Sequence, residues 1–125
     1  MTSEENTLTA IEFYRTAYEG SPREAVERYV GRWYTQHNPW VADGPDAFVA
    51  YFERMQTEYP DKSIEFVRSV AQGDLVALHT HQTWPDEVEY VTMDFFRFDD
   101  GGKIVEHWDA VQEIPATAEN GNGMY

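Results

Sequence analysis

Two side chains that can transfer protons, His107 and Asp109, lie two positions apart in the segment 103–114. Alternate residues of an extended strand point to the same face, so His107 and Asp109 share one face while Trp108 points to the other. Imidazole and carboxylate groups are common general acids and bases in enzymes. The spacing therefore predicts either an acid–base site or the polar rim of a sheet.

The turn at residues 99–102, which reads Asp-Asp-Gly-Gly, predicts how this strand pairs with the preceding one. A loop of two or four residues places Asp94 opposite His107, with Cβ atoms about 5 Å apart. Asp109 then follows on the same face. A three-residue loop would shift the pairing by one residue and separate Asp94 from His107.

We therefore predict a catalytic cluster of Asp94, His107 and Asp109. If helices cover this face, burial and mutual repulsion would raise the pKa of at least one carboxyl group, and a charged His107 would lower it. The two carboxyl groups could then divide into an acid and a base, which suits removal of a proton beside a carbonyl. The alternative is a structural Asp–His ion pair.

Four further residues are predicted to contact a ligand. His37 and Asn38 lie where the chain must cross the mouth of any cavity between helices and sheet, and they could orient a ligand oxygen. The alternative for Asn38 is a turn in which it binds its own backbone. Phe52 and Phe96 are expected to shape the apolar wall of the cavity.

His79 and His81 share one face of a predicted strand, which is a suitable beginning for a metal site. A metal site needs a complete set of ligands and supporting contacts, and the sequence offers no unambiguous third ligand. We therefore predict no metal, and we place His79 among the ligand-binding residues.

The elements that must position these residues are helices in the first half of the chain and strands in the second. The spacing of apolar residues predicts helices over residues 8–18, 22–30 and 45–59. The segment 32–45 is expected to be a short extended piece followed by a loop. An apolar period of two then predicts antiparallel strands over residues 63–71, 75–84, 88–98 and 103–114, interrupted at 85–87. This order is typical of an α+β fold, with one domain over residues 1–125.

The composition restricts the partners of the protein. The chain has 125 residues, with 9 basic and 23 acidic side chains and a formal net charge of −14. That charge repels phosphate backbones and anionic surfaces, so we expect neither nucleic acid nor a membrane as partner. Such acidity is typical of salt-adapted or simply very soluble proteins. The absence of cysteine excludes disulfides and thiolate chemistry.

The location and the oligomeric state can also be predicted. The sequence shows neither the pattern of a signal peptide nor an apolar run of membrane-spanning length, so we expect a cytoplasmic protein. Trp108 points away from the cluster, and an exposed tryptophan is costly on a monomer. We therefore expect a homodimer formed through the outer face of the sheet.

Several motifs together resemble one known family. These are Y-T-Q-H-N-P at 34–39, A-Q-G-D-L-V-A-L-H at 71–79, F-R-F-D-D-G-G-K-I-V-E-H-W-D at 96–109 and N-G-N-G-M-Y at 120–125. They are similar to the SnoaL-like branch of the NTF2-like superfamily, which includes polyketide cyclases. The resemblance implies a cone-shaped α+β barrel in which a curved sheet wraps around helices and encloses an apolar pocket.

The resemblance also implies a reaction without a cofactor. The catalytic aspartate of the cyclases, which acts as acid and base in an aldol closure, matches Asp109. Their pocket histidine falls at Asp94, so this chain departs from the cyclases at that position. His107 or Asp94 could take over the role of that histidine.

Three functions are consistent with these residues. The first is a cofactor-independent cyclase, isomerase or dehydratase that acts on a small apolar carbonyl compound. The second is a small-molecule-binding or dimerisation module without chemistry. The third is a lyase or hydrolase assisted by a metal bound at His79 and His81.

Overall fold

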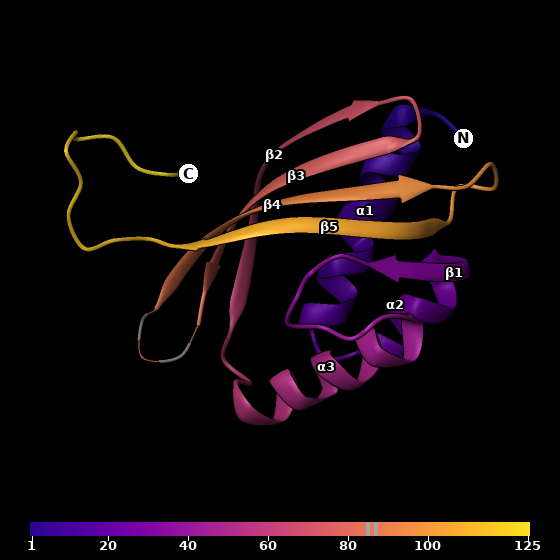
Figure 1. The fold of residues 1–125 in the computed structure, drawn as a ribbon, viewed down its shortest axis with the longest axis horizontal. Coiled ribbons are helices and arrows are strands. Elements are labelled where there is room, and N and C mark those ends of the chain that lie inside the picture. Colours follow the sequence, from indigo (N-terminus) through magenta and orange to yellow (C-terminus); the bar gives the residue numbers. More distant parts are fainter. Residues whose placement is uncertain (85, 87) are drawn as a thin grey trace.

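The computed structural model describes residues 1–84, 86 and 88–125. Within them the chain forms three helices and five strands, in the order α1 (Ser3–Tyr18), α2 (Pro22–Tyr29), β1 (Val30–Gln36), α3 (Pro45–Glu58), β2 (Ser63–Gln72), β3 (Leu75–Thr83), β4 (Glu89–Phe98) and β5 (Ile104–Glu113). The strands form one sheet in the order β1-β5-β4-β3-β2 (Figure 1). The predicted α+β class is confirmed. The interruption expected at residues 85–87 lies outside the described residues, apart from Asp86.

The short extended piece predicted after α2 is strand β1, and it is followed by a loop as expected; its place in the sheet as a fifth strand was not predicted. β1 pairs in parallel with β5 and brings Gln36 next to His107. Close contact between these strands needs a residue without a side chain at Gly31, where a Cβ atom would lie 2.8 Å from the carboxylate of Asp99. Parallel pairing joins segments about 70 residues apart in the chain, so it leaves no turn signal in the sequence.

The pairing of β4 with β5 differs from the predicted one by two residues. Asp94 lies opposite Asp109, whereas the prediction placed it opposite His107. One residue of the shift arises at the turn, because Phe98 pairs with Ile104 and not with Lys103. The other arises between Arg97 and Phe98, where the register changes by one residue. Because side chains alternate between faces with a period of two, a shift of two residues keeps all three members of the cluster on one face.

Aromatic side chains join the helices to the inner face of the sheet. Phe13 of α1 stacks on Phe48 of α3 with ring centroids 4.8 Å apart, and it meets Phe96 of β4 edge to face at 5.9 Å. All three side chains are buried. Burial of each such ring stabilises the fold by roughly 1.5–3 kcal/mol. This core fixes α1 and α3 over the strands that carry the polar cluster.

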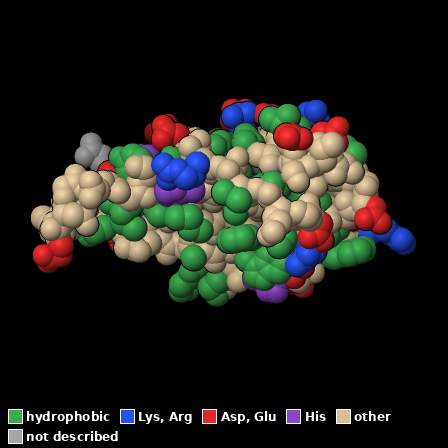
Figure 2. Space-filling model, turned by 90° about the horizontal axis from the view of Figure 1, so that it is seen from above, with side chains coloured by type: hydrophobic (Ala, Val, Ile, Leu, Met, Phe, Trp, Pro, Cys, Tyr) green, Lys and Arg blue, Asp and Glu red, His purple; other side chains and the backbone are tan. Residues whose placement is uncertain are grey.

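The outer face of the sheet carries exposed apolar side chains. Met93 and Phe95 of β4 are each 44% exposed, and Val70 of β2, which lies opposite Ala77 as Phe95 does, is 69% exposed. Viewed from above, the molecule has hydrophobic side chains gathered across its middle and charged side chains nearer its edges (Figure 2). In the part of the chain that the structure describes, no helix is long and apolar enough to cross a membrane.

Candidate active site

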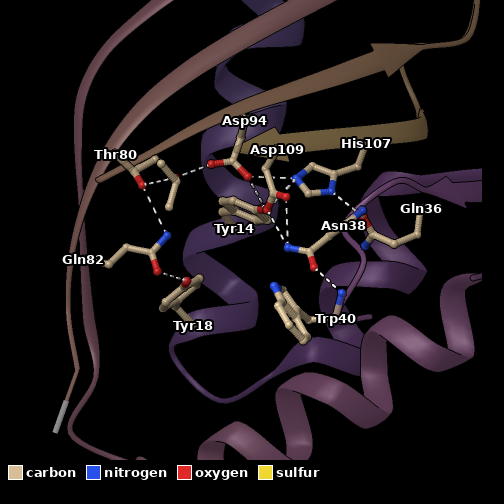
Figure 3. A network of polar contacts seen from close by, with 11 residues as sticks. Tyr14, Tyr18, Gln36, Asn38, Trp40, Thr80, Gln82, Asp94, His107 and Asp109 are labelled. Carbon is tan, nitrogen blue, oxygen red and sulfur yellow. Dashed lines mark hydrogen bonds and ion pairs between the residues drawn. The ribbon is translucent and has the colours of Figure 1, made fainter. Parts of the chain in front are cut away.

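The predicted cluster of Asp94, His107 and Asp109 assembles on the inner face of β4 and β5, beneath α1 (Figure 3). His107 Nε2 lies 2.8 Å from Asp94 Oδ1 and 3.8 Å from Asp109 Oδ2. The hydroxyl of Tyr14, on α1, lies 2.8 Å from the same Nε2. The helix therefore supplies a fourth polar group to the cluster that the strands form.

A cavity of about 600 Å³ opens over this cluster. Buried side chains, including Thr92, His107 and Phe52, mark its inner end, whereas Trp40, which is 81% exposed, marks its mouth. A volume of this size accommodates a small organic molecule. Asp109 and His107 line the cavity, so both can contact a ligand held there.

Asp94 is buried behind the cavity wall, with only 1% of its surface exposed. Its Oδ2 accepts a hydrogen bond from the Thr92 hydroxyl at 2.5 Å, and its Oδ1 accepts one from the Tyr14 hydroxyl at 2.6 Å. The imidazole of His107 contacts the same Oδ1. These contacts occupy both oxygens, so Asp94 holds its neighbours in place instead of meeting the ligand.

A chain of hydrogen bonds on β3 and β4 fixes Asp94 as an acceptor. The indole N–H of Trp84, which can only donate, donates to Gln82 Oε1 at 3.1 Å. The Gln82 amide therefore donates from Nε2 to Thr80 at 3.2 Å, and Thr80 in turn donates to Thr92 at 2.5 Å. Thr92 then has its proton free for Asp94. Each donor in the chain is determined by the one before it.

A second chain fixes the protonation of His107. The backbone N–H of Asn38 donates to Gln36 Oε1 at 3.0 Å, so this oxygen also accepts from His107 Nδ1 at 2.7 Å. Nδ1 therefore carries a hydrogen. An unprotonated Nε2 would place its lone pair against Asp94 Oδ1 at 2.8 Å, so a proton also lies between these two atoms. His107 can deliver that proton to a ligand.

Asp109 is the carboxylate that faces the cavity. Asn38 Nδ2 donates to both of its oxygens, at 2.9 and 3.0 Å, and the amide is oriented because its oxygen accepts from Trp40 N at 2.8 Å. Burial raises the pKa of Asp109, opposed by the nearby charge of His107, reinforced by Asp94 and again opposed by the Asn38 hydrogen bond. A carboxylate with a raised pKa is a stronger proton acceptor than an ordinary aspartate.

Tyr14 remains a hydroxyl donor at neutral pH. Burial raises its pKa well above the ordinary value of 10.0, and the negative charges of Asp94 and Asp109 act in the same direction. The phenol therefore keeps its proton and donates it to Asp94. It adds a neutral donor beside the proton that His107 shares with Asp94.

The ligand-binding residues predicted from the sequence divide into two groups. Asn38 and Phe52 line the cavity. His37, His79 and Phe96 do not, and this corrects their placement. Phe96 is fully buried in the core beneath the site.

His37 lies on the outer face of the sheet. Its ring stacks on Trp108 with centroids 4.9 Å apart, and its Nε2 lies 2.7 Å from Glu106 Oε2. Consecutive residues of an extended segment point to opposite sides, so Asn38 turns inward where His37 turns outward. The two neighbours therefore serve different faces.

The pair His79 and His81 also lies outside, where the C-terminal segment covers it. His79 Nε2 lies 2.9 Å from the carbonyl oxygen of Met124, and His81 Nε2 lies 2.6 Å from Glu89 Oε1. The His81 ring stacks on Tyr125 at 3.7 Å. Both Nε2 atoms thus have protein partners, and the two histidines share no third ligand among the described residues.

The cluster of Asp94, His107 and Asp109 has the residue types of a metal site, since one ligand atom from each lies within 4.8 Å of the others. However, Asp94 Oδ1 and His107 Nε2 approach to 2.8 Å with a proton between them. A cation would have to displace that proton and the hydrogen bonds from Tyr14 and Asn38. This arrangement suits proton transfer better than metal binding.

Sequence reasoning missed two members of the site. Tyr14 shares the apolar stripe of α1 and is indistinguishable there from a core residue. Gln36 lies on β1, which was expected to lead into a loop. Only the assembled fold brings them to His107, so no local pattern could have identified them.

Comparison with solved structures identifies the class of fold. TsrD from Streptomyces laurentii aligns with a TM-score of 0.75 at 20% identity, over 89% of this chain and 91% of that one. A candidate polyketide cyclase from Acidithiobacillus ferrooxidans gives 0.73 at 18%, over 89% and 91%. A candidate ketosteroid isomerase from Kribbella flavida gives 0.71 at 20%, over 97% and 85%. The chain has the NTF2-like fold.

The sequence identifies the family within that class. The model of the SnoaL-like domain matches residues 10–107, which is most of the chain. The protein therefore belongs to the SnoaL-like family, and the resemblance noted in its motifs is confirmed. A search of the curated proteins finds no significant match.

Proposed function

We propose that the protein is a cofactor-independent acid–base enzyme that removes a proton beside the carbonyl of a small apolar compound. The observation that carries this proposal is the pairing of Asp109 with His107 at the inner end of the cavity. Asp109 is a largely buried carboxylate with a raised pKa, and its Oδ2 lies 3.8 Å from His107 Nε2. A base and an acid thus face the same space.

The reaction begins when an Asp109 oxygen accepts the proton from the carbon next to the carbonyl. Negative charge then develops on the carbonyl oxygen, and the Nε2–H of His107, until then shared with Asp94, donates to that oxygen. The negative charge thus passes from Asp109 to the substrate oxygen, where the imidazolium of His107 balances it. Asp109 becomes a carboxylic acid and can return its proton to another atom of the product.

Asp94 and Gln36 are positioning residues in this proposal. Gln36 holds Nδ1 of the imidazole, and Asp94 holds Nε2. The ring therefore cannot rotate away from the ligand. A fixed donor avoids the cost of reorganisation when charge develops in the transition state.

The comparisons support the type of reaction without supplying the substrate. The solved structures include proteins described as candidate polyketide cyclases and as a candidate ketosteroid isomerase. Cyclisation of the aldol type and isomerisation of a ketosteroid both begin with proton removal beside a carbonyl. The same first step fits the residues of this cavity.

The proposal can be tested without knowledge of the natural substrate. The protein is incubated in D₂O with small cyclic and aryl ketones, and proton NMR follows deuterium incorporation beside the carbonyl. We expect catalysed exchange for at least one ketone, and Asp109→Asn should slow it at least about 100-fold. Glu106→Gln, on the outer face of the same strand, should exchange at the wild-type rate. Ketone binding without exchange would instead favour a non-catalytic binding module.

A further inference from the structure

The mouth of the cavity is built from aromatic rings that stand at steep angles to one another. Trp84 meets Tyr59 with ring centroids 5.5 Å apart at 70°, and it meets Tyr90 at 6.4 Å and 85°. All three line the cavity. We call Tyr59, Trp84 and Tyr90 the aromatic corner. Three electron-rich rings therefore border the same part of the cavity.

The aromatic corner is held in place before any ligand arrives. The Trp84 indole donates to Gln82, and its backbone N–H donates to the carbonyl of Val88 at 2.8 Å. Tyr59 follows α3 and its N–H donates to Met55 at 2.8 Å. A preformed binding surface loses little conformational entropy on binding.

The charges around the cavity are mainly negative. Asp86, at the exposed rim, and Asp109, at the inner end, both line it, whereas no lysine or arginine does so among the described residues. The positive charge that His107 can carry is balanced by Asp94 at 2.8 Å. The whole chain adds a field from its net charge of −14. An anionic ligand would therefore be repelled and a cation attracted.

Aromatic faces beside a carboxylate form the arrangement that recognises alkylammonium groups. We propose that the aromatic corner binds an ammonium group, so that the ligand of this cavity is an aminated carbonyl compound. The ammonium lies against Tyr59, Trp84 and Tyr90 in the cavity that Asp86 also lines, and the carbonyl end reaches toward Asp109. The carbonyl half of this inference rests on the proposed function, whereas the ammonium half rests on the rings and charges alone.

The test uses three probes of the same shape and different charge. Choline is cationic, 3,3-dimethylbutan-1-ol is its neutral isostere, and 3,3-dimethylbutanoate is the matching anion. Binding is measured from chemical-shift changes in NMR titrations at low salt. We expect choline to bind about tenfold more tightly than the alcohol, and the anion to bind most weakly. Equal affinities, or tightest binding of the anion, would overturn the proposal.

Variants locate the ammonium group. Tyr59→Leu should weaken choline about tenfold and change the affinity for the alcohol less than twofold, while Tyr59→Phe, which keeps the ring, should bind choline like the wild type. Tyr29→Leu is the matched control, because Tyr29 is an aromatic residue outside the cavity lining. Loss of choline binding in Asp109→Asn with no loss in Tyr59→Leu would place the ammonium at the inner end and refute the corner as its site.

The result is separable from that of the exchange experiment. Choline titration needs no turnover, so absence of deuterium exchange would remove the carbonyl chemistry and leave the ammonium site standing. Conversely, deuterium exchange that depends on Asp109, together with equal affinities for the three probes, would support the enzyme and refute the ammonium site.

Discussion

The two faces of one sheet carry similar residues in very different settings. On the inner face, His107 contacts Asp94 with both side chains almost fully buried. On the outer face, His37 contacts Glu106 and His81 contacts Glu89, with at least one member of each pair well exposed to solvent. The same residue types thus form a buried hydrogen-bonded network on the inner face and solvent-exposed pairs on the outer face.

The difference between the faces lies in the direction of the hydrogen bonds. On the inner face, indole and backbone N–H groups, which can only donate, fix the orientation of the side-chain amides of Gln36, Asn38 and Gln82. The outer pairs compete with water and lack such a constraint. The candidate site is distinguished less by its residue types than by the burial and fixed orientation of its hydrogen-bonding groups.

The largest difference between the faces should appear when one carboxylate is removed from each. Asp94→Asn replaces an acceptor with a group that cannot accept from Thr92, Tyr14 and His107 together, and it should lower the free energy of unfolding by about 3 kcal/mol. Glu106→Gln, on the outer face, should lower it by less than about 1 kcal/mol. Urea unfolding measures both, and equal losses would abolish the distinction drawn between the faces.

A smaller effect is expected from breaking the donor chain that leads to Asp94. Thr92→Val keeps the shape of the side chain but removes the hydroxyl that donates to Asp94 Oδ2, and it should cost about 1–2 kcal/mol. Thr92→Ser keeps the donor and should recover most of that loss. If valine and serine destabilise the protein equally, the hydrogen bond is not the cause.

Replacing Asp109 should have the opposite effect to replacing Asp94, because burial raises the pKa of Asp109. Folding favours its protonated form, so its contribution to stability is complete at low pH and is lost as the pH rises through the raised pKa. Asp109→Asn should therefore be at least as stable as the wild type at pH 7, and any advantage should shrink as the pH falls. Thermal melts across the acidic range test this, and a variant less stable at pH 7 would argue for a structural role.

The smallest effect on turnover should come from the apolar part of the outer face, which we propose pairs with a second copy of the chain. Met93, Phe95 and Val70 are exposed apolar residues there, and Phe95 and Val70 both lie opposite Ala77 of β3. Phe95→Lys should convert a dimer into a monomer in light-scattering measurements while leaving deuterium exchange unchanged. A wild-type protein that is already monomeric would contradict the proposed pairing.

Most of the architecture could be predicted because it depends on local patterns. Helical spacing and the change to a period of two identified the helices and four strands, and the turn at 99–102 identified the last hairpin. The cluster on β4 and β5 was predicted correctly although the predicted register was wrong, because the total error of two residues leaves each side chain on the same face. Alternation between faces is thus more robust than the exact pairing of residues.

The remaining part of the site depends on contacts between distant segments. Tyr14 and Gln36 reach His107 from α1 and from the parallel strand β1, which no turn announces. His37 was assigned to the cavity together with Asn38, although neighbours in an extended segment point in opposite directions. Once β1 is known to extend to Gln36, that alternation would have assigned them to different faces.

Asp109, which faces the cavity, is the proposed proton acceptor of this site. A carbon-13 NMR titration of its side-chain carboxyl, assigned by comparison with Asp109→Asn, tests that role directly. We expect a titration midpoint clearly above the value of about 3.9 that is usual for aspartate. A midpoint at or below that value would contradict this role.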